Sequence, residues 1–138
     1  MWQCPNCNKT FAKVNQHHQC VEVPVQEIFL NKSPHLSDVY QHLLNQMQSI
    51  GGFTVTTSLK SITLYGPQHK SFLIIQPKRK WIDIWFPLDH KVEDFPVFKI
   101  QQPSKSRYAH FVRLEDEEDL SPIVLEWIAE AHQLTNPS

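Results

Sequence analysis

The segment SFLIIQPKRKWIDIWF, residues 71–86, decides the fold of this 138-residue chain. It contains two short runs rich in β-branched and aromatic residues, SFLIIQ and WIDIWF, which are separated by the turn PKRK. Runs of this length and composition, bounded by proline and charge, are typical of β-strands. Because a four-residue connection leaves no room for a helix, we expect the two strands to pair antiparallel.

Further strand-like segments lie on both sides of this pair. FTVTTSL and SITLYG, within residues 53–66, precede it, and RYAHFVRL, residues 107–114, follows. Residues 87–106 contain three prolines, and we expect a looser, irregular stretch there. The sequence therefore predicts an antiparallel sheet with short connections.

Helical patterns flank the strands. From Ser33 and Pro34, which suit a helix start, apolar residues recur at spacings of three and four as far as Ile50. A second helix is expected after Ser121 and Pro122, and a short helical turn at residues 26–31. The order of helix, strands and helix predicts an α+β fold, a two-layer sandwich with the helices on one face of the antiparallel sheet.

The composition is that of a globular protein with an uneven charge distribution. Hydrophobic residues make up 41% and charged residues 20%, and the net charge is −1. Residues 54–113 carry ten Lys/Arg against four Asp/Glu, a net of +6, and the remainder carries a net of −7. Two readings follow: the basic middle meets an anionic partner, or the acidic C-terminal segment packs beside it and cancels its field.

The N-terminal residues MWQCPNC lack the basic and apolar regions of a secretory signal. No apolar run approaches the roughly 20 residues that span a bilayer. We therefore expect a cytoplasmic protein without a membrane partner. Three clustered cysteines are an odd number for disulfides, and reduced thiols fit a metal site better.

Residues 1–21 are interpreted as a zinc knuckle that precedes an α+β domain at residues 22–138. Cys4, Cys7 and Cys20 supply three thiolates, and His17 or His18 supplies an imidazole, which together make the ligand set of a closed structural zinc site. Spacing alone leaves both histidines open. A redox role for the Cys-x-x-Cys pair is the weaker alternative, because Cys20 would be superfluous.

The knuckle is too short for a DNA-reading finger. Nine residues separate Cys7 from His17, so a long recognition helix does not fit between them. We expect a hairpin or knuckle followed by about one helical turn, with Trp2 and Phe11 covering the metal.

The N-terminal residues MWQCPNCNKTF, followed by NQHHQC, form a distinctive motif. In this motif the chain resembles a family of small, mostly prokaryotic proteins known as domain of unknown function 5655. The resemblance covers nearly the whole chain, through SPHLSDVYQHLL, the 71–86 strands, YAHFVRL and LSPIVLEWIAEAH. It implies His18 as the fourth zinc ligand, agrees with an α+β core and supplies no activity. Asn8 departs from the glycine that is usual after the second cysteine. The N-terminal motif that carries the resemblance comprises Trp2, Cys4, Pro5, Cys7, Phe11, Asn15, Gln16, His18 and Cys20.

The strand WIDIWF carries the candidate binding surface. Alternation places Trp81, Asp83 and Trp85 on one face, beside the basic cluster Lys78, Arg79 and Lys80. Aromatic rings interleaved with cations are typical of surfaces that bind single-stranded nucleic acid, because bases stack on the rings and cations contact phosphates. Alternatively, the 87–106 stretch covers the tryptophans and forms a second small core.

His110 is a further candidate if it points the same way as Trp81 and Asp83; otherwise it is simply hydrogen-bonded. No nucleophile–base pair can be named, so we expect a non-enzymatic, zinc-stabilised binding module with nucleic acid as its partner. The alternatives are a small-ligand or catalytic pocket between the sheet and residues 87–106, using His110 and Asp83, and a protein-interaction adaptor that docks through the zinc knuckle.

Overall fold

The computed structural model describes residues 2–3, 10–11, 24–58 and 60–137. Six strands form one antiparallel sheet in the order β3-β4-β5-β6-β8-β7. This confirms the α+β class with an antiparallel sheet. The strand bounds are β3 Thr54–Thr57, β4 Ile62–Tyr65, β5 Ser71–Pro77, β6 Ile82–Leu88, β7 Val97–Ser104 and β8 Arg107–Leu114.

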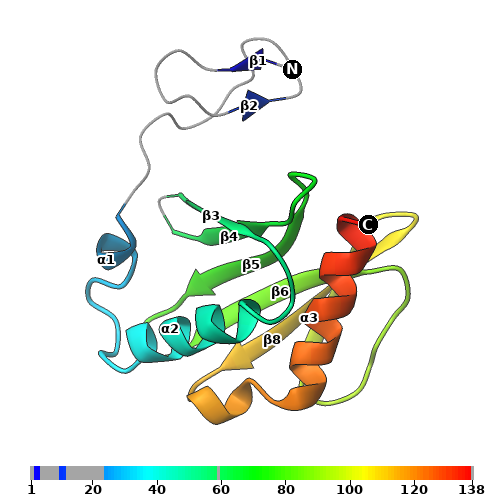
Figure 1. Cartoon of the computed structure of the whole chain (residues 1–138). Coiled ribbons are helices and arrows are strands. Elements are labelled where there is room, and N and C mark those ends of the chain that lie inside the picture. Colours follow the sequence, from blue (N-terminus) through cyan, green and yellow to red (C-terminus); the bar gives the residue numbers. More distant parts are fainter. Residues whose placement is uncertain (1, 4–9, 12–23, 59, 138) are drawn as a thin grey trace.

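Two long helices, α2 (Leu36–Met47) and α3 (Pro122–Thr135), lie over the same face of this sheet (Figure 1). A short helix, α1 (Val25–Ile28), precedes them, and a 3₁₀ turn, η1 (Glu117–Asp119), lies between β8 and α3. Among the described residues, no helix lies over the opposite face of the sheet. In the described part of the chain, the sheet therefore has one face covered by helices and one face without a helix over it.

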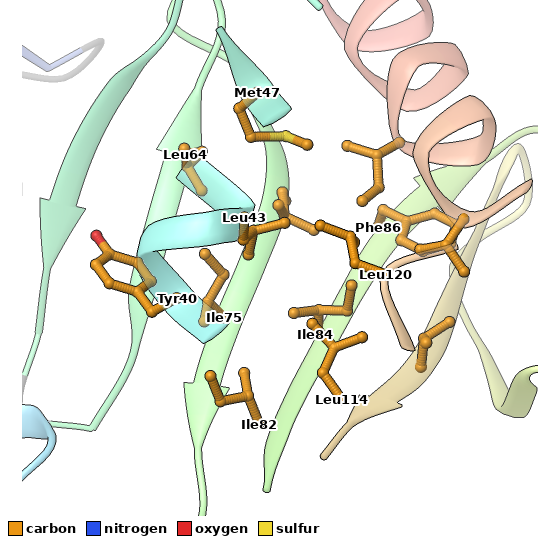
Figure 2. Packing of buried hydrophobic residues seen from close by; sticks show 14 of the residues in the cluster. Tyr40, Leu43, Met47, Leu64, Ile75, Ile82, Ile84, Phe86, Leu114 and Leu120 are labelled. Carbon is orange, nitrogen blue, oxygen red and sulfur yellow. The ribbon is translucent and has the colours of Figure 1, made fainter. Parts of the chain in front are cut away.

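The core lies between the two helices and the covered face (Figure 2). Its sheet side is mainly aliphatic and includes the fully buried rings of Phe72 on β5 and Phe86 on β6. Burial of such side chains stabilises by about 1.5–3 kcal/mol each, which makes this layer the main source of folding energy. The buried residues labelled in Figure 2 are Tyr40, Leu43, Met47, Leu64, Ile75, Ile82, Ile84, Phe86, Leu114 and Leu120.

We expected an irregular stretch at residues 87–106, and this prediction is wrong for the second half, which forms β7. β7 is an edge strand that pairs only with β8, so Pro103 near its end removes no sheet hydrogen bond that a central strand would need. The ladder is also irregular at two places, which obscures the alternation of the sequence. Because β7 lies in the sheet on the far side of β8, it does not lie over Trp81 and Trp85.

The helix starts agree only in part with the sequence analysis. α3 begins at Pro122 after Ser121, as predicted. α2 begins at Leu36 and not after Ser33, because a turn intervenes in which the Leu36 amide donates to the Ser33 carbonyl over 3.0 Å. The Ser33 amide meanwhile donates to the Arg79 carbonyl over 2.8 Å and joins this turn to the β5–β6 connection.

Near the N-terminus, β1 (Trp2–Gln3) and β2 (Thr10–Phe11) pair antiparallel, with Trp2 opposite Phe11. This ladder agrees with the expected hairpin. The predicted zinc ligands Cys4, Cys7, His18 and Cys20, and the boundary between residues 21 and 22, lie outside the described residues.

None of the helices in the described part of the chain has the length and apolar character needed to cross a membrane.

Candidate functional site

The side chains of β6 alternate between the two faces of the sheet. Ile82, Ile84 and Phe86 are fully buried under the helices, whereas Asp83 and Trp85 are half-buried on the other side, which we call the outer face. The predicted division of WIDIWF between two faces is therefore confirmed. Period-two alternation was sufficient to find it, because β6 is regular along its whole length.

β8 continues the outer face beside β6. Its ladder places Arg113 opposite Asp83, and Phe111 opposite Trp85. The rings of Trp85 and Phe111 are stacked, with centroids 5.1 Å apart and planes inclined by 27°. Cross-strand aromatic pairs of this kind contribute beyond their buried area. Phe111 was not among the predicted surface residues.

Arg113 is held at the centre of the outer face. The carbon at the centre of its guanidinium lies 4.3 Å from the ring centroid of Trp81 and 4.9 Å from that of Phe98. Its Nε–H donates to Oδ1 of Asp83 over 3.3 Å, and this carboxylate side chain is only 13% exposed. A guanidinium fixed between two rings and a carboxylate is positioned before any ligand arrives.

β7 adds a third row of side chains to the outer face, and this row includes a β-bulge. Val97 pairs with Val112 and Lys99 pairs with Phe111, so Phe98 is the extra residue of β7. A bulge redirects side chains, and here Phe98 and Lys99 both contact rings of the outer face. Phe98 lies edge-on to Phe111 at 6.3 Å, and the Lys99 ammonium lies 5.1 Å above the Phe111 ring. Phe98 remains 48% exposed.

We call this arrangement the aromatic surface. It joins three strands that are separated in sequence, and it contains four rings and two cations. The sequence analysis missed Phe98 because β7 was not predicted, and the bulge breaks the alternation that could have revealed it. The members of the aromatic surface are Trp81, Asp83, Trp85, Phe98, Lys99, Phe111 and Arg113.

The predicted basic cluster lies directly before the aromatic surface in the chain, in the turn between β5 and β6. The turn is closed by the Lys78 amide, which donates to the Trp81 carbonyl over 2.7 Å. Arg79 and Lys80 are exposed and Lys78 is half-buried. The turn therefore presents these cations next to Trp81.

Trp81 has one unusual feature. Its indole Nε1 is buried and has no hydrogen-bond acceptor in the described part of the chain. A buried donor without a partner costs about 1–3 kcal/mol.

His110 does not join this surface, and of its two readings the hydrogen-bonded one is confirmed. It lies opposite Phe86 on the covered face, with its ring parallel to that of Phe86 at 5.9 Å, and it is 0% exposed. A single pocket that uses both His110 and Asp83 is therefore excluded, because the sheet separates them. Burial of this histidine is possible because both of its ring nitrogens are hydrogen-bonded.

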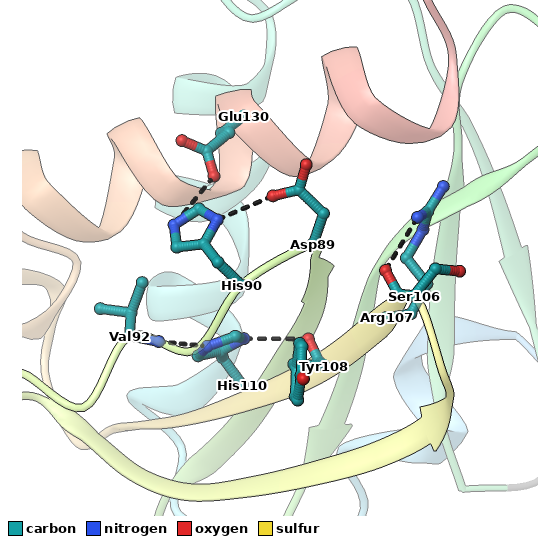
Figure 3. A network of polar contacts seen from close by, with 8 residues as sticks. All are labelled: Asp89, His90, Val92, Ser106, Arg107, Tyr108, His110 and Glu130. Carbon is teal, nitrogen blue, oxygen red and sulfur yellow. Dashed lines mark hydrogen bonds and ion pairs between the residues drawn. The ribbon is translucent and has the colours of Figure 1, made fainter.

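A polar cluster lies at the end of β6. His90 Nδ1 is 2.7 Å from Asp89 Oδ1, and His90 Nε2 is 3.6 Å from Glu130 Oε2 on α3 (Figure 3). These three residues offer ligand atoms within 4.8 Å of one another, so in principle they could hold a metal ion. Because each ring nitrogen faces a different carboxylate, the geometry is that of an imidazolium between two anions. These contacts raise the pKa of His90 above its ordinary value.

A separate shallow groove of about 610 Å³ lies between α1, α2 and β3. None of its lining residues is charged, and its one titratable group is Tyr40, whose hydroxyl pKa is raised by burial. It therefore offers no acid–base pair. Its lining residues are Val25, Gln26, Phe29, Ser37, Tyr40, Gln41, Leu44 and Val55.

The described residues form a small α+β sandwich, and the sheet face opposite its helices carries aromatic rings and cations. Residues 25–135 match the model of a family described as a domain of unknown function (DUF5655), and the chain belongs to this family. The match begins after the cysteine-rich module. No curated protein and no solved structure matches the chain.

Proposed function

We propose that the chain is a non-enzymatic, zinc-stabilised binding module that holds single-stranded nucleic acid on the aromatic surface. The observation that carries this proposal is the position of Arg113, fixed between the rings of Trp81 and Phe98 on the uncovered side of the sheet. Unpaired bases stack on aromatic rings and on guanidinium planes, and this stacking is tolerant of sequence.

The charges beside the rings favour an anionic ligand. Lys78, Arg79 and Lys80 lie at one end of the row and Lys99 on another strand, whereas the one carboxylate of the surface, Asp83, is paired with Arg113. A chain of phosphates that crosses the surface would meet cations at both positions while its bases reach the rings. Duplex nucleic acid is less suited, because its bases are already stacked on one another.

Zinc has a structural part in the proposal. A set of three thiolates and one imidazole, Cys4, Cys7, Cys20 and His18, leaves no position for a reactive water. Metal analysis of protein purified without chelator should give about one zinc per chain, and less than about half an equivalent contradicts the ligand assignment. Removal of the metal is expected to leave the residues 24–137 folded, which far-UV circular dichroism can test.

Charge reversal of the basic cluster tests the binding surface. The triple variant K78E/R79E/K80E should lose binding to a fluorescent single-stranded oligonucleotide, measured by anisotropy at low salt. The matched control is K60E/K70E/K105E, which makes the same change in net charge in turns between other strands. Equal affinity of the K78E/R79E/K80E variant and the wild type would refute the proposal.

The salt dependence of the wild type gives a second test. The logarithm of the binding constant should fall linearly with the logarithm of salt concentration, with a slope of about −0.7 for each phosphate neutralised on a single strand. A protein partner that docks through the rings would show a much weaker dependence on salt. Absence of oligonucleotide binding at any salt concentration would turn the search toward such a partner.

A further inference from the structure

Residues 89–96 hold β7 in place. β8 lies between β6 and β7 in the sheet, so this segment must pass from Leu88, past β8, to Val97. Two histidines hold it to the body of the domain: His90, which belongs to the segment, and His110, which lies beneath it on β8 (Figure 3). The segment leads directly into Phe98 and Lys99 of the aromatic surface.

His110 acts as a hydrogen-bond acceptor for the segment. The Val92 amide donates to His110 Nε2 over 2.8 Å, and His110 Nδ1 lies 2.9 Å from the Tyr108 carbonyl, to which it donates. These partners fix the neutral tautomer, with its proton on Nδ1. A proton on Nε2 would face the Val92 N–H, donor against donor, inside a site with no exposure to solvent.

His90 differs from His110, because its contacts with two carboxylates require that its imidazole ring is protonated. Its ring joins Asp89 on one side to Glu130 of α3 on the other. Arg107 on β8 adds a favourable charge for Asp89. Between them, the two histidines bind the segment to both α3 and β8 only when His90 is charged and His110 is neutral.

We propose that residues 89–96 form a proton-sensitive clasp, in which protonation of His110 releases the segment and loosens the start of β7. This step transfers one proton to Nε2 and breaks one hydrogen bond, that from the Val92 amide. The clasp consists of His110 on the covered face and residues 89–96, none of which belongs to the aromatic surface. It therefore does not depend on which ligand that surface binds.

The directions of titration agree with this geometry. Burial is the largest cause that lowers the pKa of His110 below its ordinary value of about 6.5, and the positive charge of His90 lowers it further. Glu130, on α3, and the backbone carbonyls of Tyr108 and Phe86 act the other way and raise it. Since the folded pKa lies below the unfolded one, the contribution of His110 is complete above about pH 6.5 and is lost as the pH falls from there.

Amide hydrogen exchange tests the clasp without reference to function. The protection factor of the Val92 amide, measured by NMR on the full chain between about pH 5 and 7.5, should fall by up to tenfold per pH unit below about 6.5. His110→Gln keeps an acceptor and a donor but cannot titrate, so its protection should be flat. A wild-type protection factor that is constant over this range would overturn the proposal.

His90→Gln provides the control for the other histidine. It should retain the acid-dependent loss at Val92, since His110 still titrates, while its protection near pH 7.5 should be lower than that of the wild type because the link to Glu130 is gone. A variant that instead abolishes the acid-dependent loss would show that His90, and not His110, is the sensor.

A binding measurement tests whether release of the clasp also changes the aromatic surface. This test rests on the proposed function. If β7 loosens, affinity for a single-stranded oligonucleotide should fall on acidification, severalfold between about pH 7 and 5.5. A purely electrostatic surface behaves oppositely, because histidines gain positive charge. No binding at any pH contradicts the proposed function alone, whereas binding that strengthens with acid contradicts the link between clasp and surface.

Discussion

The same strands supply both faces of the sheet, but the two faces differ in composition and packing. On β6, the covered face carries Ile82, Ile84 and Phe86 with no exposure, and the outer face carries Asp83 and Trp85 with partial exposure. The covered face is aliphatic and packs against helices, so its energy comes from removing area from water. The outer face consists of rings, cations and a carboxylate that pack on one another within one layer.

This difference predicts different costs of truncation on the two faces. Truncation on the covered face opens a cavity that helices and sheet cannot close, whereas truncation on the outer face exposes neighbours to water. Truncation on the outer face is therefore expected to cost less stability than truncation in the core.

The largest expected effect comes from the neighbouring pair Phe86 and Trp85. Phe86→Ala should lower the free energy of unfolding by about 3–5 kcal/mol. Trp85→Ala should cost about 2 kcal/mol, because half-burial roughly halves the area that is lost. Urea denaturation of both variants measures the difference. Equal losses would mean that the outer face is a second core.

Arg113 gives the next effect, because it joins the rows of the outer face. Arg113→Ala should cost about 1–2 kcal/mol, from two cation–ring contacts of about 0.5–1 kcal/mol each. It should also weaken oligonucleotide binding more than it weakens the fold. Arg113→Lys keeps the charge but loses the planar stack, so an affinity restored fully by lysine would show that charge alone matters.

The pH dependence of stability should come from the covered face. Because the pKa of His110 is lowered by burial, the free energy of unfolding should decline as the pH falls below about 6.5, and His110→Gln should flatten this decline. His90 has the opposite sign: its raised pKa means that its contribution is present below about 6.5 and is lost as the pH rises through the folded value. Chemical denaturation at several pH values separates the contributions of the two histidines.

The smallest effect is expected at Lys99, on the strand that the sequence did not reveal. Lys99→Ala should change stability by only about 0.5 kcal/mol, the value of an exposed cation–ring contact. If Lys99 contacts a phosphate, its removal should make the slope of the salt dependence shallower by the contribution of about one phosphate contact. An unchanged salt dependence would remove Lys99 from the binding surface and leave Phe98 as the contribution of β7.

Most of the fold was predictable because local rules suffice for regular strands and capped helices. β6 shows clear alternation, β5 and β8 alternate over most of their length, and Pro122 after Ser121 marks the start of α3. β7 was not predictable, since its prolines suggest a loop and its bulges disturb the period of two. Edge strands tolerate both features, but only the pairing with β8 shows that β7 is an edge strand.

Three of the seven members of the aromatic surface were found in the same way. Trp81, Asp83 and Trp85 follow from alternation within one strand, whereas Phe98 and Phe111 depend on which strands become neighbours. The face on which His110 lies was left open by the sequence, because it depends on which residues pack against β8. Its two hydrogen-bond partners, the Tyr108 carbonyl and the Val92 amide, make burial of the neutral ring possible.

The sequence by itself determined the α+β class, the antiparallel pairing around the PKRK turn and the division of WIDIWF between two faces. These features depend on residues that are close in the chain, where period and turn chemistry act directly. Only the tertiary structure decided that β8 inserts between β6 and β7. That insertion gathers the rings of the aromatic surface around Arg113 and buries His110 beneath residues 89–96, because register between distant strands is set by packing of the whole layer.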